Sequence, residues 1–308
     1  MLKYILRRCL MLAPVVLGVS LIIFVIMKLT PGDPILNAFG IQPTGDQSYI
    51  SELRAKLGLD EPIYVQYGKF LWRLMQGDFG RSIASNKPVV ALISETLPNT
   101  LILILSAVIV AALIGIPIGV ISAVRQGTWI DHTTRVASIF AASIPDFWLG
   151  LVLMMVFSYY LGLTPIAGHG TIQHLILPAS TLGIGLSGVI VRLTRSNLLE
   201  IIRQDFITAA YARGLSRTRV IWKHALRNAL IPIITVLGLQ LGFLIAGAFF
   251  VEWIFGWPGI GRLTVQAITQ RDYPVVLGAL FVTSIAYVLI NLIVDIIYAY
   301  IDPRVKYE

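Results

Sequence analysis

Long apolar runs separated by short polar segments dominate the hydrophobic pattern of this chain. Inside a lipid bilayer the backbone must satisfy its own hydrogen bonds, so a run of about 20 apolar residues predicts a membrane-spanning helix. Strands of a membrane barrel would instead alternate apolar and polar positions over about ten residues, and the sequence shows no such alternation. The pattern predicts an all-α integral membrane protein with six transmembrane helices, near residues 9–29, 100–124, 136–163, 175–191, 229–251 and 275–301.

The composition supports this class and excludes several others. Of 308 residues, 56% are apolar and 13% are charged, with a mean hydropathy of +0.81, whereas about 25% charged residues is usual in soluble domains. So few charged side chains could not cover a soluble globule of this size. The chain is too apolar for disorder, and its single cysteine, Cys9, excludes a disulfide-stapled scaffold.

Charge is unevenly divided between the two sides of the predicted topology. If the N-terminus lies inside, the inner segments hold 15 of the 24 basic residues and a net charge of +10, whereas all remaining residues together carry −2. Basic residues concentrate in cytoplasmic loops, so this asymmetry predicts that both termini are inside. The lipid bilayer therefore accounts for the net charge of +8, and no nucleic-acid partner is predicted.

The first apolar run follows Lys3, Arg7 and Arg8, which is also the pattern of a secretory signal peptide. The run is long, however, and the Pro-Gly-Asp-Pro of residues 31–34 follows it in place of a small-residue cleavage site. We therefore predict a retained first span, with a signal peptide as the alternative.

The predicted spans leave a long polar segment on the outer side. Residues 31–96 are expected to form a small folded cap, between an N-terminal transmembrane helix at 1–30 and a five-helix core at 97–308. Within this cap, helix-like patterns occupy residues 52–57 and 64–75.

A second long polar segment, residues 197–228, lies on the predicted inner side. It contains an amphipathic helix that Gly214 is placed to end, because glycine readily adopts the left-handed conformation of a helix C-terminus. Ser216 is a candidate N-cap for a second short helix over residues 220–226. From the residues alone, the segment could equally be an interfacial helix that faces lipid. One face of the first helix consists of Ile207, Ala210, Tyr211 and Gly214.

Ionisable residues within spans are costly in lipid and are candidates for function. Asp146 follows Pro145 in the third predicted span, where a proline kink suits the wall of a translocation path. Its alternative role is an ion pair, for example with Arg262. Asp295 lies one helical turn after Asn291 in the sixth span, which indicates either the same path or a structural hydrogen bond between helices.

No combination of residues indicates catalysis or metal binding. The four histidines are scattered between inner and outer segments and form no metal-ligand cluster. The sequence contains no Ser/His/Asp or Cys/His set that could be argued, and no Gly-x-x-x-x-Gly-Lys-Ser/Thr phosphate loop. The chain is therefore predicted not to be an enzyme and to hold no cofactor of its own.

The inner loop resembles a signature of ABC importer membrane subunits, the binding-protein-dependent transport permeases of bacteria and archaea. That signature reads Glu-Ala-Ala, three residues, Gly, and here Thr208, Ala209 and Ala210 precede Gly214 with the same spacing. Thr208 stands where the family has Glu, and later positions of the signature also differ. These departures are similar to the dipeptide and oligopeptide permease branch, in its first-subunit type.

Motifs along the whole chain resemble the same branch in the same order. Each motif alone is weak, whereas their joint order is specific. They are MLKYILRR at 1–8, PGDP at 31–34, LGLD at 57–60, GDFG at 77–80, SIPDFW at 143–148, GWPG at 256–259, RDYP at 271–274 and DPR at 302–304.

The resemblance implies a permease subunit of an ATP-driven importer for di- or oligopeptides, in a prokaryotic cytoplasmic (inner) membrane. Implied partners are a second permease subunit, two ABC ATPase subunits that hold ATP and Mg, and an extracytoplasmic substrate-binding protein. Very similar chains of the family carry nickel, glutathione or other small solutes, and the sequence does not separate these. A stand-alone secondary transporter is the alternative from another class, and it would be expected to show inverted repeats and several ion-coupling residues.

By the same resemblance, residues 205–215 form the coupling helix that docks on an ATPase. Small residues would allow close approach, and arginines would pair with acids on the ATPase or, alternatively, with lipid phosphates. The predicted contact residues are Thr208, Ala209, Ala210, Arg213, Gly214 and Arg217.

Three further candidates lie at or beyond the outer end of the fifth predicted span: Glu252, Trp257 and Arg271. A tryptophan at this depth is ordinarily a membrane anchor. The same residues are equally candidates for an external gate or for contact with the binding protein.

Overall fold

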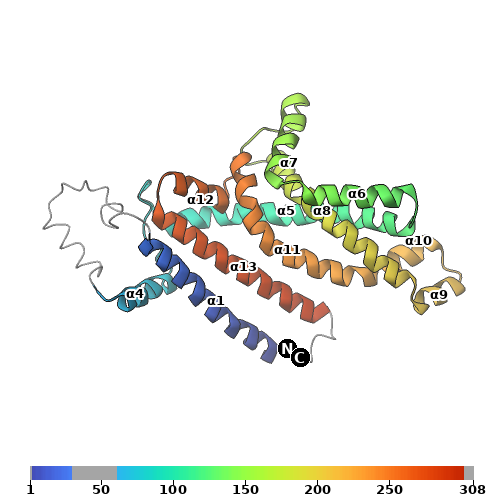
Figure 1. Cartoon of the computed structure of the whole chain (residues 1–308), viewed down its shortest axis with the longest axis horizontal. Coiled ribbons are helices and arrows are strands. Elements are labelled where there is room, and N and C mark those ends of the chain that lie inside the picture. Colours follow the sequence, from blue (N-terminus) through green and yellow to red (C-terminus); the bar gives the residue numbers. More distant parts are fainter. Residues whose placement is uncertain (1, 30–60, 302–308) are drawn as a thin grey trace. The chain divides into compact units, whose positions relative to one another are not determined.

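The computed structural model describes residues 2–29 and 61–301, and within these ranges the regular elements are helices, apart from one isolated bridge between Arg81 and Pro88. The predicted all-α membrane class is thereby confirmed. The chain divides into two compact units, one of residues 99–262 with the segment from 287 onward, the other of residues 2–98 with 263–286. Figure 1 shows the helices of both units.

Several helices are long and apolar enough to cross a membrane. The described residues contain four such helices, Val89–Val124, Ile172–Ile202, Arg217–Ile245 and Tyr273–Val294, and a bent pair, Trp129–Ser143 with Asp146–Tyr160, would form a fifth span. The first helix contributes a shorter apolar stretch, Ala13–Ile26. The multi-pass character is thus clear, whereas the count of six spans and the N-inside, C-inside orientation stay predictions.

The unit of residues 99–262 consists of α-helices with π-helices (η) at two places. A π-helix is a wider turn that often marks a functional position. One π segment follows α7 and the other leads into α11. The elements in order are α5 (Val89–Val124), α6 (Trp129–Ser143), α7 (Asp146–Leu153), η1 (Met154–Tyr160), α8 (Ile172–Ile202), α9 (Asp205–Ala212), α10 (Arg217–Arg219), η2 (Val220–Ala225) and α11 (Leu226–Ile254).

Helix α8 is the centre of this unit and packs against α6, α7 and α11. Its glycines bring neighbouring backbones close, since a Cβ on Gly183 would lie 2.8 Å from the Ala107 carbonyl of α5, and one on Gly188 would clash with the Ser138 carbonyl of α6. The sequence predicts the fourth span as a short helix over residues 175–191. In the structure, α8 is one continuous helix of 31 residues.

The third span, predicted as one helix over 136–163, is not straight. Helices α6 and α7 meet at a bend of 103°, and Figure 1 shows α7 turning away from α6. Pro145 has no N–H to continue the helix and disfavours a helical conformation at the preceding residue, so Ile144 is extended with ψ 128°. The predicted kink at Pro145 is confirmed, and the bend is large enough that the third predicted span consists of two helices.

In the other unit, α1 (Leu2–Leu29) packs against α4 (Ile63–Met75). The ring of Phe24 lies 5.3 Å from that of Tyr67 and 5.7 Å from that of Phe70, measured between centroids. Helix α4 confirms the helical pattern predicted for residues 64–75, whereas the pattern at 52–57 lies outside the described residues.

Asp272 organises the rest of that unit, between α12 (Ile260–Thr269) and α13 (Tyr273–Ile301). Its buried carboxylate accepts hydrogen bonds from the Ser82 hydroxyl at 2.5 Å and from the N–H groups of Ile83 at 3.1 Å and Ala84 at 3.2 Å. The loop it holds leads directly into α5, which begins at Val89. The first two turns of α5 therefore occupy residues that the sequence assigned to the external segment.

Candidate functional site

The predicted coupling helix is present as α9, and it ends where the sequence indicates. Gly214 has φ +74°, its N–H donates to the Tyr211 carbonyl at 2.9 Å, and the Leu215 N–H donates to the Ala210 carbonyl at 3.4 Å. These two bonds satisfy carbonyls at the end of the helix in the pattern of a Schellman motif, which requires a left-handed residue at this place. The role predicted for Gly214 in ending the helix is confirmed.

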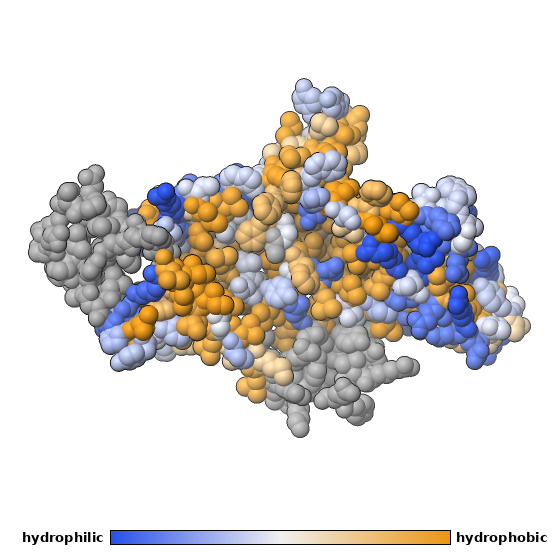
Figure 2. Space-filling view, viewed as in Figure 1, coloured by the Kyte–Doolittle hydropathy of each residue, from blue (hydrophilic) through white to orange (hydrophobic). Residues whose placement is uncertain are grey.

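The two faces of α9 differ sharply in exposure. Ile207 and Ala210 are buried in an apolar cluster of this chain, whereas Thr208, Ala209 and Arg213 are exposed. Ala210 therefore packs inward in this structure, whereas the ATPase contact expected of it stays a prediction. In Figure 2, hydrophilic residues gather at the end of the unit that carries α9 and α10.

The apolar cluster under α9 joins four other elements of the same unit. It draws residues from α5, α8, η2 and α11, so α9 is packed against three candidate spans through close-packed side chains. Its buried members are Val120, Ala123, Leu198, Ile207, Ala210, Val220, Ile221, Ala225, Leu226 and Ala229.

The second short helix predicted after Gly214 does not exist as a separate element. Ser216 does occupy the N-cap position of α10, although its side chain makes no capping hydrogen bond. From Arg217 the helix continues through η2 into α11 without a break. The segment that follows α9 is thus the first part of the candidate span Arg217–Ile245. Arg217 reaches the end of α5, where it donates a long hydrogen bond of 3.5 Å to the Val124 carbonyl.

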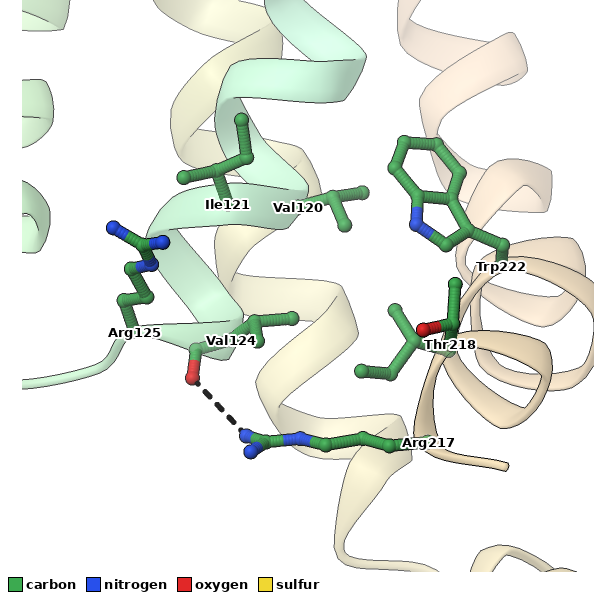
Figure 3. Close-up of a pocket in the computed structure, with 8 residues that line it drawn as sticks. Val120, Ile121, Val124, Arg125, Arg217, Thr218 and Trp222 are labelled. Atoms are coloured by element: carbon green, nitrogen blue, oxygen red, sulfur yellow. Dashed lines mark hydrogen bonds between the residues drawn. The ribbon is translucent and has the colours of Figure 1, made fainter. Parts of the chain in front are cut away.

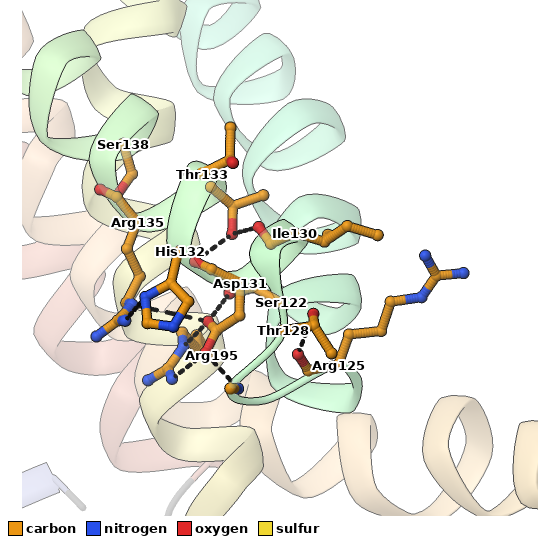
Figure 4. A network of polar contacts seen from close by, with 12 residues as sticks. Ser122, Arg125, Thr128, Ile130, Asp131, His132, Thr133, Arg135, Ser138 and Arg195 are labelled. Carbon is orange, nitrogen blue, oxygen red and sulfur yellow. Dashed lines mark hydrogen bonds and ion pairs between the residues drawn. The ribbon is translucent and has the colours of Figure 1, made fainter.

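A buried ion pair, which the sequence analysis missed, holds α5, α6 and α8 together close to this cluster (Figure 4). The Asp131 carboxylate, 1% exposed, accepts bonds from Arg195 Nε at 2.6 Å and Arg195 Nη2 at 2.8 Å. The Ser122 hydroxyl at 2.7 Å and the Gly127 N–H at 3.0 Å donate to the same group. The sequence does show an acid in the first helical turn after Gly127 and Thr128, which could have indicated a structural carboxylate. It does not identify the partner, because Arg195 lies 64 residues away in the chain.

Asp146, the first residue of α7, is half-buried between two glycines. A Cβ on Gly185 of α8 would lie 3.2 Å from one carboxylate oxygen, and a Cβ on Gly247 of α11 would lie 3.5 Å from the other. Among the described residues no hydrogen bond or ion pair to this carboxylate is present. The alternative pairing with Arg262 is not formed, because the Arg262 guanidinium donates to the Gly256 carbonyl.

Two other residues, Asn291 and Asp295, are predicted for a translocation path, and no contact among the described residues joins either of them to Asp146. Asn291 lies against α11, where a Cβ on Gly242 would be 3.3 Å from its amide nitrogen. The side chain of Asp295 lies outside the described residues. The three residues therefore remain separate candidates.

Glu252 and Trp257 are buried in this structure, and their role as external gate or contact residues stays a prediction. The Glu252 carboxylate accepts bonds from the Thr100 hydroxyl at 2.5 Å and from the N–H groups of Gly261 at 2.8 Å and Arg262 at 3.1 Å, so it caps the start of α12. Trp257 Nε1 donates to the Asn99 carbonyl at 3.0 Å. Both residues thus stabilise the turn that follows α11.

Arg271, the third of these candidates, is exposed and has φ +56°. It precedes Asp272, whose hydrogen bonds to residues 82–84 hold the backbone at this point. In the described part of the chain, no group of three or more His, Cys, Asp or Glu residues could hold a metal ion.

Comparisons with known proteins place this geometry in context. A family model described as "Binding-protein-dependent transport system inner membrane component" matches residues 115–307, and a model for the N-terminal part of such components matches residues 1–104. The glutathione transport system permease protein GsiC of Salmonella paratyphi A is 41% identical over 308 residues, and the match covers all of both chains. The oligopeptide transport system permease protein AppB of Bacillus subtilis is 44% identical over 318 residues, again across both whole chains.

A solved structure shows the same fold. The MetNI methionine ABC transporter, in an inward-facing conformation, contains a chain that matches with a TM-score of 0.59 at 22% identity. The match covers 68% of the chain described here and 96% of that chain.

Proposed function

The chain belongs to the family of binding-protein-dependent transport system inner membrane components, and from this premise we propose that it carries di- and oligopeptides across a prokaryotic cytoplasmic membrane. It is the permease component of an ABC importer. The observation that carries the peptide assignment is the 44% identity, over both whole chains, to a permease named for oligopeptide transport.

Glutathione is the second candidate substrate, because a permease named for glutathione transport is 41% identical over the same extent. Glutathione is itself a short peptide, so both candidates present a free amino group and carboxylates. Selection between them is expected to rest with the external binding protein that delivers the substrate.

The proposed partners are a second permease subunit, two ABC ATPases that hold ATP and Mg, and that binding protein. The exposed face of α9, with Thr208, Ala209, Arg213 and Gly214, docks on an ATPase. Movement of α9 passes through the apolar cluster to α5 and α11. Such coupling requires that α9 and the spans have two arrangements that the ATPase distinguishes by its contacts.

Asp146 is proposed to line the translocation path and to receive the amino group of a peptide. Its carboxylate is half-buried, lacks a partner among the described residues, and is flanked by Gly185 and Gly247, which leave room beside it. An unpaired carboxylate in a candidate span indicates function, because pairing or exclusion from lipid would otherwise be expected.

The docking role of α9 is tested by Gly214→Asp, since an aspartate side chain would project from the exposed turn where the ATPase would approach. We expect ATP-dependent uptake to fall more than tenfold while the complex stays in the membrane, because a left-handed β-carbon costs only about 1 kcal/mol. Gly162→Asp is the matched control, since Gly162 also has positive φ and open space around it but lies far from α9 in sequence. Normal import by the Gly214 variant would refute the docking assignment.

The transport function is tested by reconstituting the chain with its second permease, ATPases and binding protein in vesicles. Uptake of a labelled tripeptide, of glutathione and of nickel is measured with and without ATP. ATP-dependent uptake of the tripeptide is expected. Uptake of glutathione alone would select the second candidate, and full activity of the lone chain without ATPases would replace the importer with a secondary transporter.

A further inference from the structure

A pocket of about 430 Å³ lies at the C-terminal end of α5. Figure 3 shows Val120 and Val124 facing Thr218 and Trp222 from a stretch that is far away in the sequence. It adjoins the apolar cluster under α9, because Val120 and Ile221 belong to both. The lining residues are Val120, Ile121, Val124 and Arg125 of α5, and Arg217, Thr218, Ile221 and Trp222 of α10 and η2.

The pocket combines an apolar wall with positive charge. Five of its eight lining residues are aliphatic or aromatic, two are arginines, and none of the eight is acidic. In Figure 3, Arg217 runs along the edge of the pocket to the Val124 carbonyl, while Arg125 leaves the same end of α5 on its other side. The two guanidinium groups therefore flank the last turn of α5, and both side chains are exposed.

The position of the pocket along the helices indicates what fills it. Its two walls are ends of candidate membrane spans, Val89–Val124 and Arg217–Ile245. The pocket thus opens where two apolar helices reach their polar ends, which is the depth of phospholipid head groups. Trp222, 47% exposed, is the kind of residue that occupies this depth.

The apolar surface continues from the pocket along α5. Ile121 is four residues from Arg125, so the two lie on one face, and Leu113, two turns earlier, is 70% exposed. An acyl chain could follow this surface while a phosphate stays at the arginines. An acidic protein loop would match the charge but would leave the apolar wall without a complementary partner.

We infer that this pocket binds one anionic phospholipid from the inner leaflet, with its phosphate at the polar end of α5, where Arg217 and Arg125 reach it from the two sides of the last turn, and an acyl chain along Ile121 and Leu113. Arginine pairs with phosphate oxygens through two parallel N–H groups. Basic pockets between transmembrane helices on the cytoplasmic side bind anionic head groups. Of the two partners expected for Arg217, acids on the ATPase or lipid phosphates, this proposal selects lipid, and the bound lipid links the end of α5 to the segment that follows α9.

The test measures retained lipid on the intact importer complex, purified from vesicles that contain equal amounts of phosphatidylglycerol and phosphatidylcholine. Native mass spectrometry counts each lipid bound to wild type, to the double variant Arg125→Gln/Arg217→Gln, and to the control Arg203→Gln/Arg227→Gln. The control removes two exposed arginines of the same inner side that do not line the pocket. Size-exclusion chromatography verifies that each variant complex assembles. If the glutamine variant does not assemble, Arg125→Lys/Arg217→Lys, which keeps the charge, is measured in its place.

The wild type is expected to retain one phosphatidylglycerol per chain in preference to phosphatidylcholine. Loss of both arginines should weaken this retention about thirtyfold, since each basic residue at a membrane surface contributes about 1 kcal/mol, and the control should change it less than twofold. Partial retention, between these values, is expected of the lysine variant. Equal retention by wild type and the glutamine variant would overturn the proposal, as would equal binding of both lipids. Displacement by millimolar inorganic phosphate would also overturn it, since that result assigns the site to a free anion.

Discussion

Two acidic residues in the first turns of consecutive helices, Asp131 of α6 and Asp146 of α7, differ in the hydrogen bonds that their carboxylates accept. Asp131 is buried and accepts hydrogen bonds from the guanidinium of Arg195, the hydroxyl of Ser122 and the N–H of Gly127. Asp146 is half-buried, and the described residues supply it with no such donor. Gly185 and Gly247 lie beside its two carboxylate oxygens.

The difference separates a carboxylate that is fully hydrogen-bonded within the fold from one that is proposed to contact the substrate. A buried charge is tolerated when its partners satisfy it, and the donors around Asp131 are of the number and geometry that this requires. The donors come from α5, the following turn and α8, so the ion pair specifies how the helices meet beside the coupling segment. A carboxylate left unpaired within a candidate span indicates instead a partner that arrives and leaves, such as the amino group of a substrate.

The largest effect is expected from Asp131→Asn. The change leaves the guanidinium of Arg195 poorly paired in a largely buried site, so the free energy of unfolding should fall by about 3 kcal/mol. A thermal melt of the purified complex measures the loss. The double variant Asp131→Leu/Arg195→Met should recover much of it, because it removes both charges. A single variant as stable as wild type would mean that this carboxylate is no more structural than Asp146.

Glu252→Gln probes a third buried carboxylate that, like Asp131, has its donors in place. An amide keeps one acceptor but cannot satisfy the Thr100 hydroxyl and the N–H groups of Gly261 and Arg262 as the carboxylate does. We expect a loss of about 1–2 kcal/mol in stability, read from the same thermal melt. Glu200→Gln, at an exposed acid of α8, serves as a control for the acid–amide exchange itself. An unchanged melting temperature for Glu252→Gln would mean that, of these two buried carboxylates, only Asp131 contributes to stability.

Asp146→Asn should leave stability unchanged and reduce transport. Removing a charged hydrogen bond to a substrate amine lowers uptake by about tenfold, equivalent to about 1.4 kcal/mol. The measurement compares ATP-dependent uptake of a peptide with a free N-terminus and of its N-acetylated form, for which little change is expected. The control is Glu200→Gln, an exposed acid of α8. Equal losses for the two peptides would argue against contact between Asp146 and the amine.

The smallest effect is expected from Gly185→Ala, which adds a methyl group 3.2 Å from a carboxylate oxygen of Asp146. The carboxylate must shift by a few tenths of an ångström, and uptake should fall about threefold because a displaced contact group loses alignment with its substrate. Gly68→Ala, with open space around it in α4, is the matched control. Unchanged uptake would show that the room beside Asp146 is not used.

Much of the fold was readable from sequence because apolar run length and glycine chemistry are local properties. The apolar runs predicted membrane helices, Pro145 predicted the kink, and Gly214 predicted the end of the coupling helix. Each of these depends on a few neighbouring residues, either through the backbone N–H that proline lacks or through the conformations that glycine allows. The whole-chain order of motifs likewise indicated the importer family.

Only the tertiary structure decided which polar residues are satisfied and which are available. Whether Asp131, Glu252 or Asp146 has a donor depends on residues that are up to 152 positions away in the chain, and periodicity carries no information on such pairs. The same holds for Ala210, whose small side chain fits a docking surface as well as it fits the interior, and for Trp257, which is buried within the chain. The sequence by itself determined that the chain is a helical membrane permease of the importer family. Long-range packing determined which of its charges are structural, because burial and hydrogen bonding are properties of the space between helices and not of any one of them.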